Sequence, residues 1–376
     1  MRINTITCHN VYNYGASLQA YALQHYLEML GHEVKIIDFQ PYYHQNRYNI
    51  AYVPISSNYY NLCHNNLILR YLYGFIKNRD MFKTWGRKRA FDDFTKQYLR
   101  LTVNRYETSE QLQRNPPLAD IYIAGSDQIW NTDSKNGREP AYYLDFGDKE
   151  VRKISYAASF AVNKIKTELI DFVKTELKKI DIISVRESTA LSILDNLGFK
   201  GEQVLDPVFL LNKNDWVKIS MESKKYNQLN NDGYVLIYDF IGDERIKKLA
   251  SDLKNKFNIP IVSINDFNMI DYADTNINNA GPLEFLSLLN NARHVISNSF
   301  HATAFSTILE KDFYVFPVKQ QNNSSRMEDF LKQLNLSSRF CCNSIDEKDI
   351  NYGAVYTMIA NKIDHSKKFI CSSLNI

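Results

Sequence analysis

Cysteine is scarce in this 376-residue chain. Its five cysteines are an odd number, and none of them forms a Cys-x-x-Cys pair or the Cys/His spacing of a zinc site. The sequence therefore predicts neither a disulfide framework nor structural zinc. At this length the chain can bury enough apolar surface to fold without such cross-links, and it is long enough for two or three domains. The cysteines are Cys8, Cys63, Cys341, Cys342 and Cys371.

Long apolar runs are also missing. No stretch of the sequence approaches the length of a bilayer-spanning helix. Residues 1–9 alternate like a strand and lack the apolar centre of a signal peptide. We therefore expect a cytoplasmic protein with reduced thiols.

An excess of charge of one sign is absent as well, since the formal net charge is only +3. So small an excess argues against nucleic acid as the main partner. The first predicted strand is followed by neither a G-x-G-x-x-G fingerprint nor a P-loop, so no dinucleotide is inferred. What remains is the composition of an ordinary globular protein.

Strand and helix patterns alternate along the chain. Residues 2–8 predict a buried strand, residues 17–30 a helix with one apolar face, and residues 34–39 the next strand. This βαβ opening favours a parallel sheet. After Asn212 the pattern restarts with a strand at 234–240, which indicates a second α/β domain.

The predicted fold is therefore α/β, with two doubly wound, Rossmann-like domains facing a cleft. We place the N-terminal domain at 1–210, with a Tyr-rich and basic helical insertion near 41–110. The C-terminal domain takes residues 211–376, and its C-terminal tail could return to the N-terminal domain. Open α/β sheets bind ligands beyond the carboxyl ends of their strands, so the loops there are the first places to look for a site.

The most informative loop lies within residues 292–309. A short strand, Val295-Ile296-Ser297, breaks through Asn298-Ser299 and a run of small residues into an apolar helix. Such a turn leaves free backbone N–H groups that can bind an anion. His301 lies in the turn, where its imidazole could face a bound anion or transfer a proton. The alternative is that His301 caps the helix or packs beneath a loop.

A second loop follows the apolar stretch Ile121-Tyr122-Ile123. There Gly125-Ser126-Asp127 places a carboxylate at the carboxyl end of a strand, where it could accept protons from bound hydroxyls. The alternative is that Asp127 caps the following turn. Trp130 could stack on a sugar ring or simply fill the core.

Basic side chains end or flank other predicted strands. The guanidinium of Arg186 suits a carboxylate or a phosphate, although an internal ion pair with Glu187 or Asp206 would also explain it. Lys319 and Arg326 flank the loop after the strand at 313–317, at the end that can reach the pocket of His301. The basic, Tyr-rich residues 71–89 could contact anionic headgroups or a diphosphate, or form a solvated helix face.

Four sets of residues, in order along nearly the whole chain, carry a resemblance to a known family. Together they resemble the polysaccharide pyruvyl transferase family. Ser299 and Ala302 depart from the family pattern, which has Arg in some members at the first position and Gly at the second. The motifs are His9-Asn10 with Asn13-Tyr14-Gly15-Ala16 and Leu18-Gln19-Ala20-Tyr21-Ala22-Leu23; Ala124-Gly125-Ser126-Asp127-Gln128-Ile129-Trp130-Asn131; Ser184-Val185-Arg186-Glu187 with Val204-Leu205-Asp206-Pro207; and Gly281-Pro282-Leu283-Glu284-Phe285 with Ser297-Asn298-Ser299-Phe300-His301-Ala302-Thr303-Ala304-Phe305.

The resemblance implies a fold similar to the two-domain glycosyltransferase-B architecture, with the donor site in the C-terminal domain. It also implies phosphoenolpyruvate as donor, two hydroxyls of one sugar as acceptor, a cyclic pyruvate ketal as product, and no metal or organic cofactor. The expected acceptor is a galactose-type sugar in a capsule or exopolysaccharide repeat unit. A lipid-diphosphate-linked acceptor would fit the basic residues 71–89 and would place the enzyme at the inner membrane face.

Under this resemblance we assign hypothetical roles to individual residues. His301 is the general acid/base and Asp127 orients or deprotonates the acceptor. Because Ser299 replaces an Arg of some family members, Arg186, Arg293 and Arg326 are all candidates for the donor phosphate. The expected donor-binding residues are Arg186, Lys319, Arg326, Ser299 and Thr303, aided by the backbone N–H groups near Ala302. The expected acceptor-binding residues are Asn13, Tyr14, Gln128 and Trp130.

Two other functions remain open at this point. A glycosyltransferase that uses a nucleotide sugar could have the same two-domain architecture. A sugar- or anion-binding protein without catalysis could also retain the fold.

Overall fold

A computed structural model describes residues 1–44, 48, 53, 57–64, 66–77, 83–229, 233–265, 269–318, 324–342 and 344–375, with only the backbone described at 64, 77 and 324–326. Lys319 and the side chain of Arg326 lie outside this description, so their predicted donor contacts stay predictions.

The N-terminal half is built on a five-stranded sheet whose strands are all parallel. Its order is β3-β2-β1-β4-β5, so the first strand of the chain lies at the centre. A short parallel pair, β6 with β7, continues beside β5 through the bridge of Ile154 with Ile182. The strands are β1 (Arg2–Ile6), β2 (Glu33–Phe39), β3 (Leu101–Tyr106), β4 (Ile121–Ala124), β5 (Arg152–Ser155), β6 (Ser184–Val185) and β7 (Glu202–Gln203).

The C-terminal half repeats this arrangement. Its five parallel strands follow the order β10-β9-β8-β11-β12, again with the first strand of the half at the centre. Both sheets reverse their strand order beside that central strand, which is where doubly wound sheets bind ligands. The strands are β8 (Val235–Tyr238), β9 (Ile261–Ile264), β10 (Thr275–Ile277), β11 (His294–Ser297) and β12 (Asp312–Val315).

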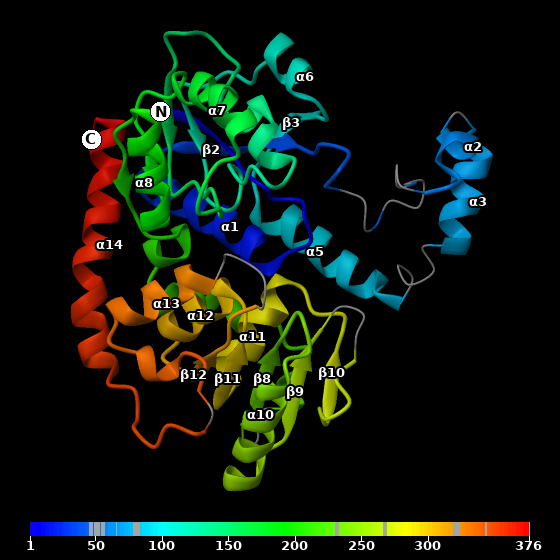
Figure 1. The fold of residues 1–376 in the computed structure, drawn as a ribbon, viewed down its shortest axis with the longest axis vertical. Helices are drawn as coiled ribbons and strands as arrows, with labels where there is room; N and C mark the ends of the chain where they lie inside the picture. The colour runs from blue at the N-terminus through cyan, green and yellow to red at the C-terminus, as the bar shows by residue number, and fades with distance from the viewer. Residues whose placement is uncertain are drawn as a thin grey trace.

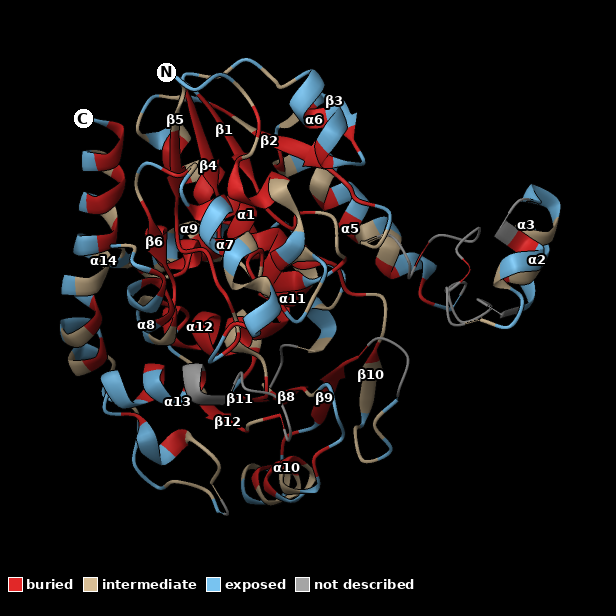
Figure 2. Cartoon of the chain, turned by 45° about the horizontal axis from the view of Figure 1, so that its top comes forward, coloured by how far each residue is buried: buried red, intermediate tan, exposed pale blue. Residues whose placement is uncertain are grey.

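Helices flank both sheets, which lie one above the other in Figure 1. The central strands β1 and β8 are buried except at Arg2, as expected for parallel strands covered on both faces (Figure 2). No helix in the described ranges is long and apolar enough to cross a membrane. The helices are α1 (Tyr14–Met29), α2 (Tyr60–His64), α3 (Leu67–Lys77), α5 (Trp85–Tyr98), α6 (Ser109–Arg114), α7 (Ile170–Leu177), α8 (Ser188–Leu197), α9 (Lys213–Ser220), α10 (Glu244–Phe257), α11 (Pro282–Asn291), α12 (Phe300–Ile308), α13 (Ser324–Gln333) and α14 (Tyr352–Leu374).

Two helices fix the halves against one another. The long C-terminal helix α14 lies along both of them in Figure 1, and its Ser373 carbonyl accepts a hydrogen bond of 3.0 Å from Arg152, the first residue of β5. Helix α5 supplies Arg87, which is fully buried and donates to the carbonyls of Tyr12 at 2.9 Å and Ala280 at 3.3 Å. Arg87 thus joins the loop after β1 to the C-terminal half, rather than forming a solvated helix face or a lipid contact.

The region 41–110 differs from the predicted insertion. It contains the edge strand β3 as well as helices, and only the pair α2 and α3 stands away from the body (Figure 1). Helix α1 also begins three residues before the predicted start. The reason is a cap: the Asn13 side chain accepts a hydrogen bond from the Ala16 amide, which lets Tyr14 and Gly15 join the first turn.

Candidate functional site

A cavity of about 360 Å³ lies where loops of the two halves meet. Much of its wall comes from the residues that follow β1, β4, β8 and β11, which are the two central strands and their neighbours at the points where the strand orders reverse. His44, Arg186 and Val318 follow β2, β6 and β12. The lining residues are Cys8, Val11, Asn13, His44, Asp127, Gln128, Asn136, Arg186, Phe240, Asn298, Ser299, Phe300, His301, Val318 and Met327.

Asp206 joins the charged groups of this cavity, although it is itself only 1% exposed. One of its oxygens, Oδ2, accepts a hydrogen bond from Arg186 Nη1 at 2.7 Å and lies 3.4 Å from His301 Nε2. Its other oxygen accepts a hydrogen bond from the Val208 amide and caps the turn Pro207–Leu210. Burial alone would raise the pKa of Asp206, but His301 and Arg186 outweigh it and hold that pKa well below its usual range.

His301 occupies the first turn of α12, which Ser299 caps by accepting from the Ala302 amide. Its imidazole packs directly on Gly15 in the first turn of α1. A β-carbon at Gly15 would lie 2.0 Å from His301 Nδ1. Only glycine therefore allows the His301 ring its position between the two halves. His301 is therefore not the helix cap; it lines the cavity and faces Asp206.

Arg186 follows β6 and forms both ion pairs that the sequence suggested. Its guanidinium contacts Asp206 at 2.7 Å and Glu187 at 3.9 Å, and it lies 5.0 Å from the centre of the Phe300 ring. It nevertheless remains part of the cavity wall. Its Nε atom and His301 Nε2 are buried without a hydrogen-bond partner among the described residues. Buried polar atoms of this kind are normally satisfied, so a bound ligand would complete the site.

Three other predicted residues line the same cavity. Asp127 has a left-handed backbone, with φ of 77°, and its carbonyl accepts from the Ser159 amide at 3.1 Å. Its neighbour Gln128 accepts from Asn131 at 3.0 Å, and Asn13 is exposed in the wall while it caps α1. The structure thus brings His301, Asp127, Arg186, Ser299, Gln128 and Asn13 to one cavity.

Two predicted acceptor contacts are corrected by the structure. Trp130 is fully buried, stacks on Tyr143 with ring centres 5.5 Å apart and donates to the Tyr142 carbonyl, so it cannot stack on a sugar. Tyr14 is buried between the halves and stacks on Phe285 at 4.4 Å. Neither residue lines the cavity.

The predicted anion contacts of α12 are also different. The Thr303 hydroxyl donates to the Ser299 carbonyl, and the amides of Ala302 and Thr303 are both bonded to Ser299. These groups are engaged in capping the helix. Arg293 precedes β11 and so lies at the amino end of that strand, away from the cavity at its carboxyl end. Its guanidinium lies over the Phe257 ring at 4.3 Å.

A comparison with known protein families matches most of the chain. The family described as Polysaccharide pyruvyl transferase matches residues 13–320. The chain belongs to this family. The resemblance seen in the sequence is thereby confirmed, while none of the curated proteins matches the chain.

Solved structures agree on the fold. A UDP-N-acetylglucosamine 2-epimerase has a TM-score of 0.54 at 8% identity, covering 99% of this chain and 95% of its own. The trehalose-6-phosphate synthase OtsA has a TM-score of 0.50 at 9% identity, covering 100% and 99%. At such identities the likeness concerns the fold alone, and it confirms two Rossmann-like domains of the glycosyltransferase-B type.

In this pyruvyl transferase family member, the sequence analysis did not predict part of the cavity wall. His44 Nε2 lies 2.7 Å from the Asn136 amide oxygen, and Asn136 in turn donates to Cys8 Sγ at 3.3 Å. Burial lowers the pKa of His44 to about 4, so this imidazole is neutral near pH 7. Asp206 was predicted only as a partner of Arg186. The signal for a larger role was its place in the family motif, Leu205-Asp206-Pro207.

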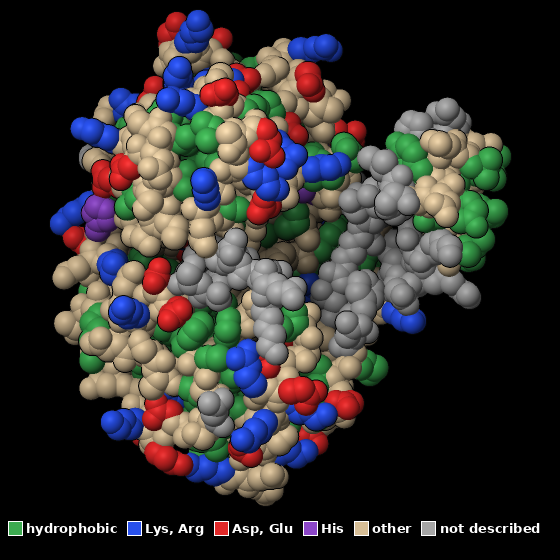
Figure 3. All heavy atoms as spheres, in the orientation of Figure 1, with side chains coloured by type: hydrophobic (Ala, Val, Ile, Leu, Met, Phe, Trp, Pro, Cys, Tyr) green, Lys and Arg blue, Asp and Glu red, His purple; other side chains and the backbone are tan. Residues whose placement is uncertain are grey.

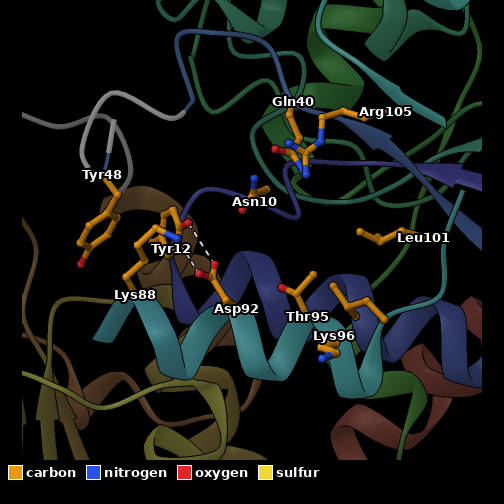
Figure 4. Close-up of a pocket in the computed structure, with 11 residues that line it drawn as sticks. Asn10, Tyr12, Gln40, Tyr48, Lys88, Asp92, Thr95, Lys96, Leu101 and Arg105 are labelled. Carbon is orange, nitrogen blue, oxygen red and sulfur yellow. Dashed lines mark hydrogen bonds and ion pairs between the residues drawn. The ribbon is translucent and has the colours of Figure 1, made fainter. Parts of the chain in front are cut away.

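A second and larger cavity, of about 760 Å³, lies on the other side of the loop after β1. Figure 4 shows Asp92 on α5 joined to the Tyr12 hydroxyl, with Lys88 one turn away. Gln40, which follows β2, and Arg105 on β3 lie across the cavity from them. The Asp92 carboxylate is 2.5 Å from Lys88 and 3.1 Å from the Tyr12 hydroxyl. All lining residues of this cavity belong to the N-terminal half.

Proposed function

We propose that this protein transfers the pyruvyl group of phosphoenolpyruvate to two hydroxyls of one sugar, forming a cyclic ketal. The observation that supports this most is the Asp206 carboxylate, which holds His301 and Arg186 at one cavity between the halves. The reaction needs both a proton donor and a cation for anionic groups, and these two side chains supply them.

The first chemical step is protonation of the donor's methylene carbon, which leaves an oxocarbenium-like centre on the adjacent carbon. A sugar hydroxyl then adds to that carbon and loses its proton. The bond from this carbon to the phosphate oxygen breaks, phosphate leaves, and the second hydroxyl adds and loses its proton. One phosphoenolpyruvate and two hydroxyls thus give one ketal and one phosphate.

His301 is the proposed general acid and base for these transfers. Asp206 lies 3.4 Å from His301 Nε2, where its carboxylate can stabilise the imidazolium that forms during these transfers. Arg186 would bind the donor carboxylate or phosphate through the buried Nε that lacks a partner among the described residues. Lys319 and Arg326 remain further candidates for the donor anions.

Asp127 is the proposed group that orients or deprotonates the acceptor, with Gln128 and Asn13 as further acceptor contacts. The acceptor is proposed to be a galactose-type sugar of a capsule or exopolysaccharide repeat unit, carried on a lipid diphosphate. The reaction is proposed to need neither metal nor organic cofactor. Activity that persists after dialysis against a chelator would agree with that, and activity restored only by added metal would contradict it.

The test is phosphate release from phosphoenolpyruvate, measured with and without a panel of galactosides and N-acetylhexosamines and followed by mass spectrometry of the sugar. Acceptor-dependent release, with a sugar heavier by pyruvate less water, is the expected result. Release without a change in the sugar would indicate hydrolysis and a missing acceptor.

The alternative glycosyltransferase makes a different prediction. A ligand that binds the folded state raises its melting temperature. We expect phosphoenolpyruvate to do so, and uridine nucleotides not to. The opposite pattern would replace the proposal with a nucleotide-sugar-dependent transferase.

A further inference from the structure

Helices α2 and α3 form a pair that stands away from the two halves (Figure 1). They pack on each other: the Tyr59 and Tyr73 rings lie 6.1 Å apart, and Cys63 Sγ contacts the Leu69 carbonyl at 3.7 Å. The two α3 residues in these contacts, Leu69 and Tyr73, are four residues apart and lie on one face of the helix. Figure 3 shows hydrophobic side chains gathered on the outer surface of the pair.

The other face of α3 is apolar and exposed. Its side chains recur in adjacent pairs every four residues, which places them on one continuous stripe of a helix. All six are between 53% and 77% exposed. They are Leu67, Ile68, Tyr71, Leu72, Phe75 and Ile76, which we call the α3 stripe. Continuous exposed apolar patches of this kind mark sites of interaction.

The sequence around the α3 stripe also lacks acidic residues. The chain has 42 Asp and Glu residues, yet none occurs between Asp38 and Asp80. Within α3 the charged residues are Arg70 and Lys77, both basic. An apolar helical face with aromatic residues and basic charge only is the pattern of helices that lie in the interface of an anionic bilayer.

We propose that the α3 stripe docks on an anionic phospholipid surface. The charge argues for this occupant over a second copy of the chain, because pairing two stripes would bring two acid-free basic segments together. The inference rests on the proposed function only for the reason why membrane binding is useful, which is to bring the enzyme to a lipid-linked acceptor. Binding to the lipid surface itself requires neither phosphoenolpyruvate nor the sugar.

The test is co-sedimentation of the full chain with phosphatidylcholine vesicles that contain about one-third phosphatidylglycerol. We expect binding to these vesicles and much weaker binding to pure phosphatidylcholine or at high salt. The double variant Leu72→Glu/Phe75→Glu should bind at least about tenfold less, because two buried apolar contacts are lost and two negative charges are added. A control with the same charge change is Val103→Glu/Leu118→Glu, whose positions are exposed on the N-terminal half.

Three outcomes would overturn the proposal. Wild-type protein that does not bind the anionic vesicles would do so, as would equal losses in the two double variants. The third is a wild-type dimer in light scattering that the α3 double variant converts to a monomer while vesicle binding is unchanged. Because no phosphoenolpyruvate or sugar is present, failure here is distinct from failure of the transferase reaction.

Discussion

The two cavities share one loop but differ in how their charges are held. Alternate residues of the loop after β1 face opposite sides, with Val11 and Asn13 in the small cavity and Asn10 and Tyr12 in the large one. In the small cavity Asp206 is buried and contacts Arg186 of the N-terminal half and His301 of the C-terminal half. In the large cavity the Asp92 side chain is 45% exposed.

The difference in burial between the two sets of charges indicates which cavity is suited to catalysis. Charges in a buried, water-excluded setting interact far more strongly than the same charges in solvent. The small cavity also requires both halves, since His301 comes from the C-terminal half while Arg186 and Asp127 come from the N-terminal half. We therefore expect catalysis to depend on the small cavity and to be indifferent to the charges of the large one.

The largest expected effect is that of His301→Ala. Removing a general acid/base should lower turnover by about 10²- to 10⁴-fold while leaving the fold intact. Phosphate release measures the rate, and circular dichroism checks the fold. Activity within a few-fold of wild type would take His301 out of the chemistry and remove the distinction between the cavities.

Gly15→Ala tests the position of the His301 ring without changing His301 itself. The added methyl group would occupy space held by His301 Nδ1, so the ring must move, and a misplaced catalytic group can cost about 10²-fold in rate. Gly353→Ala is the matched control, because its new methyl group would come no closer than 3.4 Å to its nearest neighbour. Equal activity of the two variants would show that the ring has another productive position.

Asp206→Asn should act on stability first. Leaving Arg186 buried without its carboxylate costs about 3–5 kcal/mol in the free energy of unfolding. The pKa of Asp206 is lowered in the folded state, so its stabilising contribution is full above the ordinary carboxyl pKa of about 4 and is lost as the pH falls below it.

The melting temperature of the wild type should therefore fall more steeply than that of Asp206→Asn as the pH is lowered below about 4. Denaturant unfolding at neutral pH gives the size of the loss. Parallel pH profiles and unchanged stability would mean that Asp206 is not ion-paired in solution.

The fold was largely predictable because its signals are local. Apolar strands alternating with one-faced helices determined both halves and their parallel sheets, and the structural likenesses confirm this. The start of α1 was missed because Asn13, read as a loop residue, is a helix cap. Strand β3 was missed because only Tyr106 and Thr102 are buried along it, which leaves a weak apolar pattern at a sheet edge.

The site was predictable in its residue types but not in its pairings. His301, Arg186 and Asp127 were found because polar residues follow apolar strands, and the structure places all three at one cavity. The joining role of Asp206 could not be found in this way, since it depends on a contact between residues 95 positions apart. Trp130 was wrongly predicted to contact the acceptor, because an aromatic residue beside a site loop has the same local sequence whether it stacks on a ligand or on Tyr143.

The smallest expected effect is that of Asp92→Asn in the large cavity. The lost interaction is an exposed pair with Lys88, so the free energy of unfolding should fall by less than about 1 kcal/mol. Turnover measured by phosphate release should stay within a few-fold of wild type, because Asp92 contacts none of His301, Arg186 or Asp206 within the described residues. A loss as large as that of His301→Ala would place a reacting group in the large cavity and reverse the comparison.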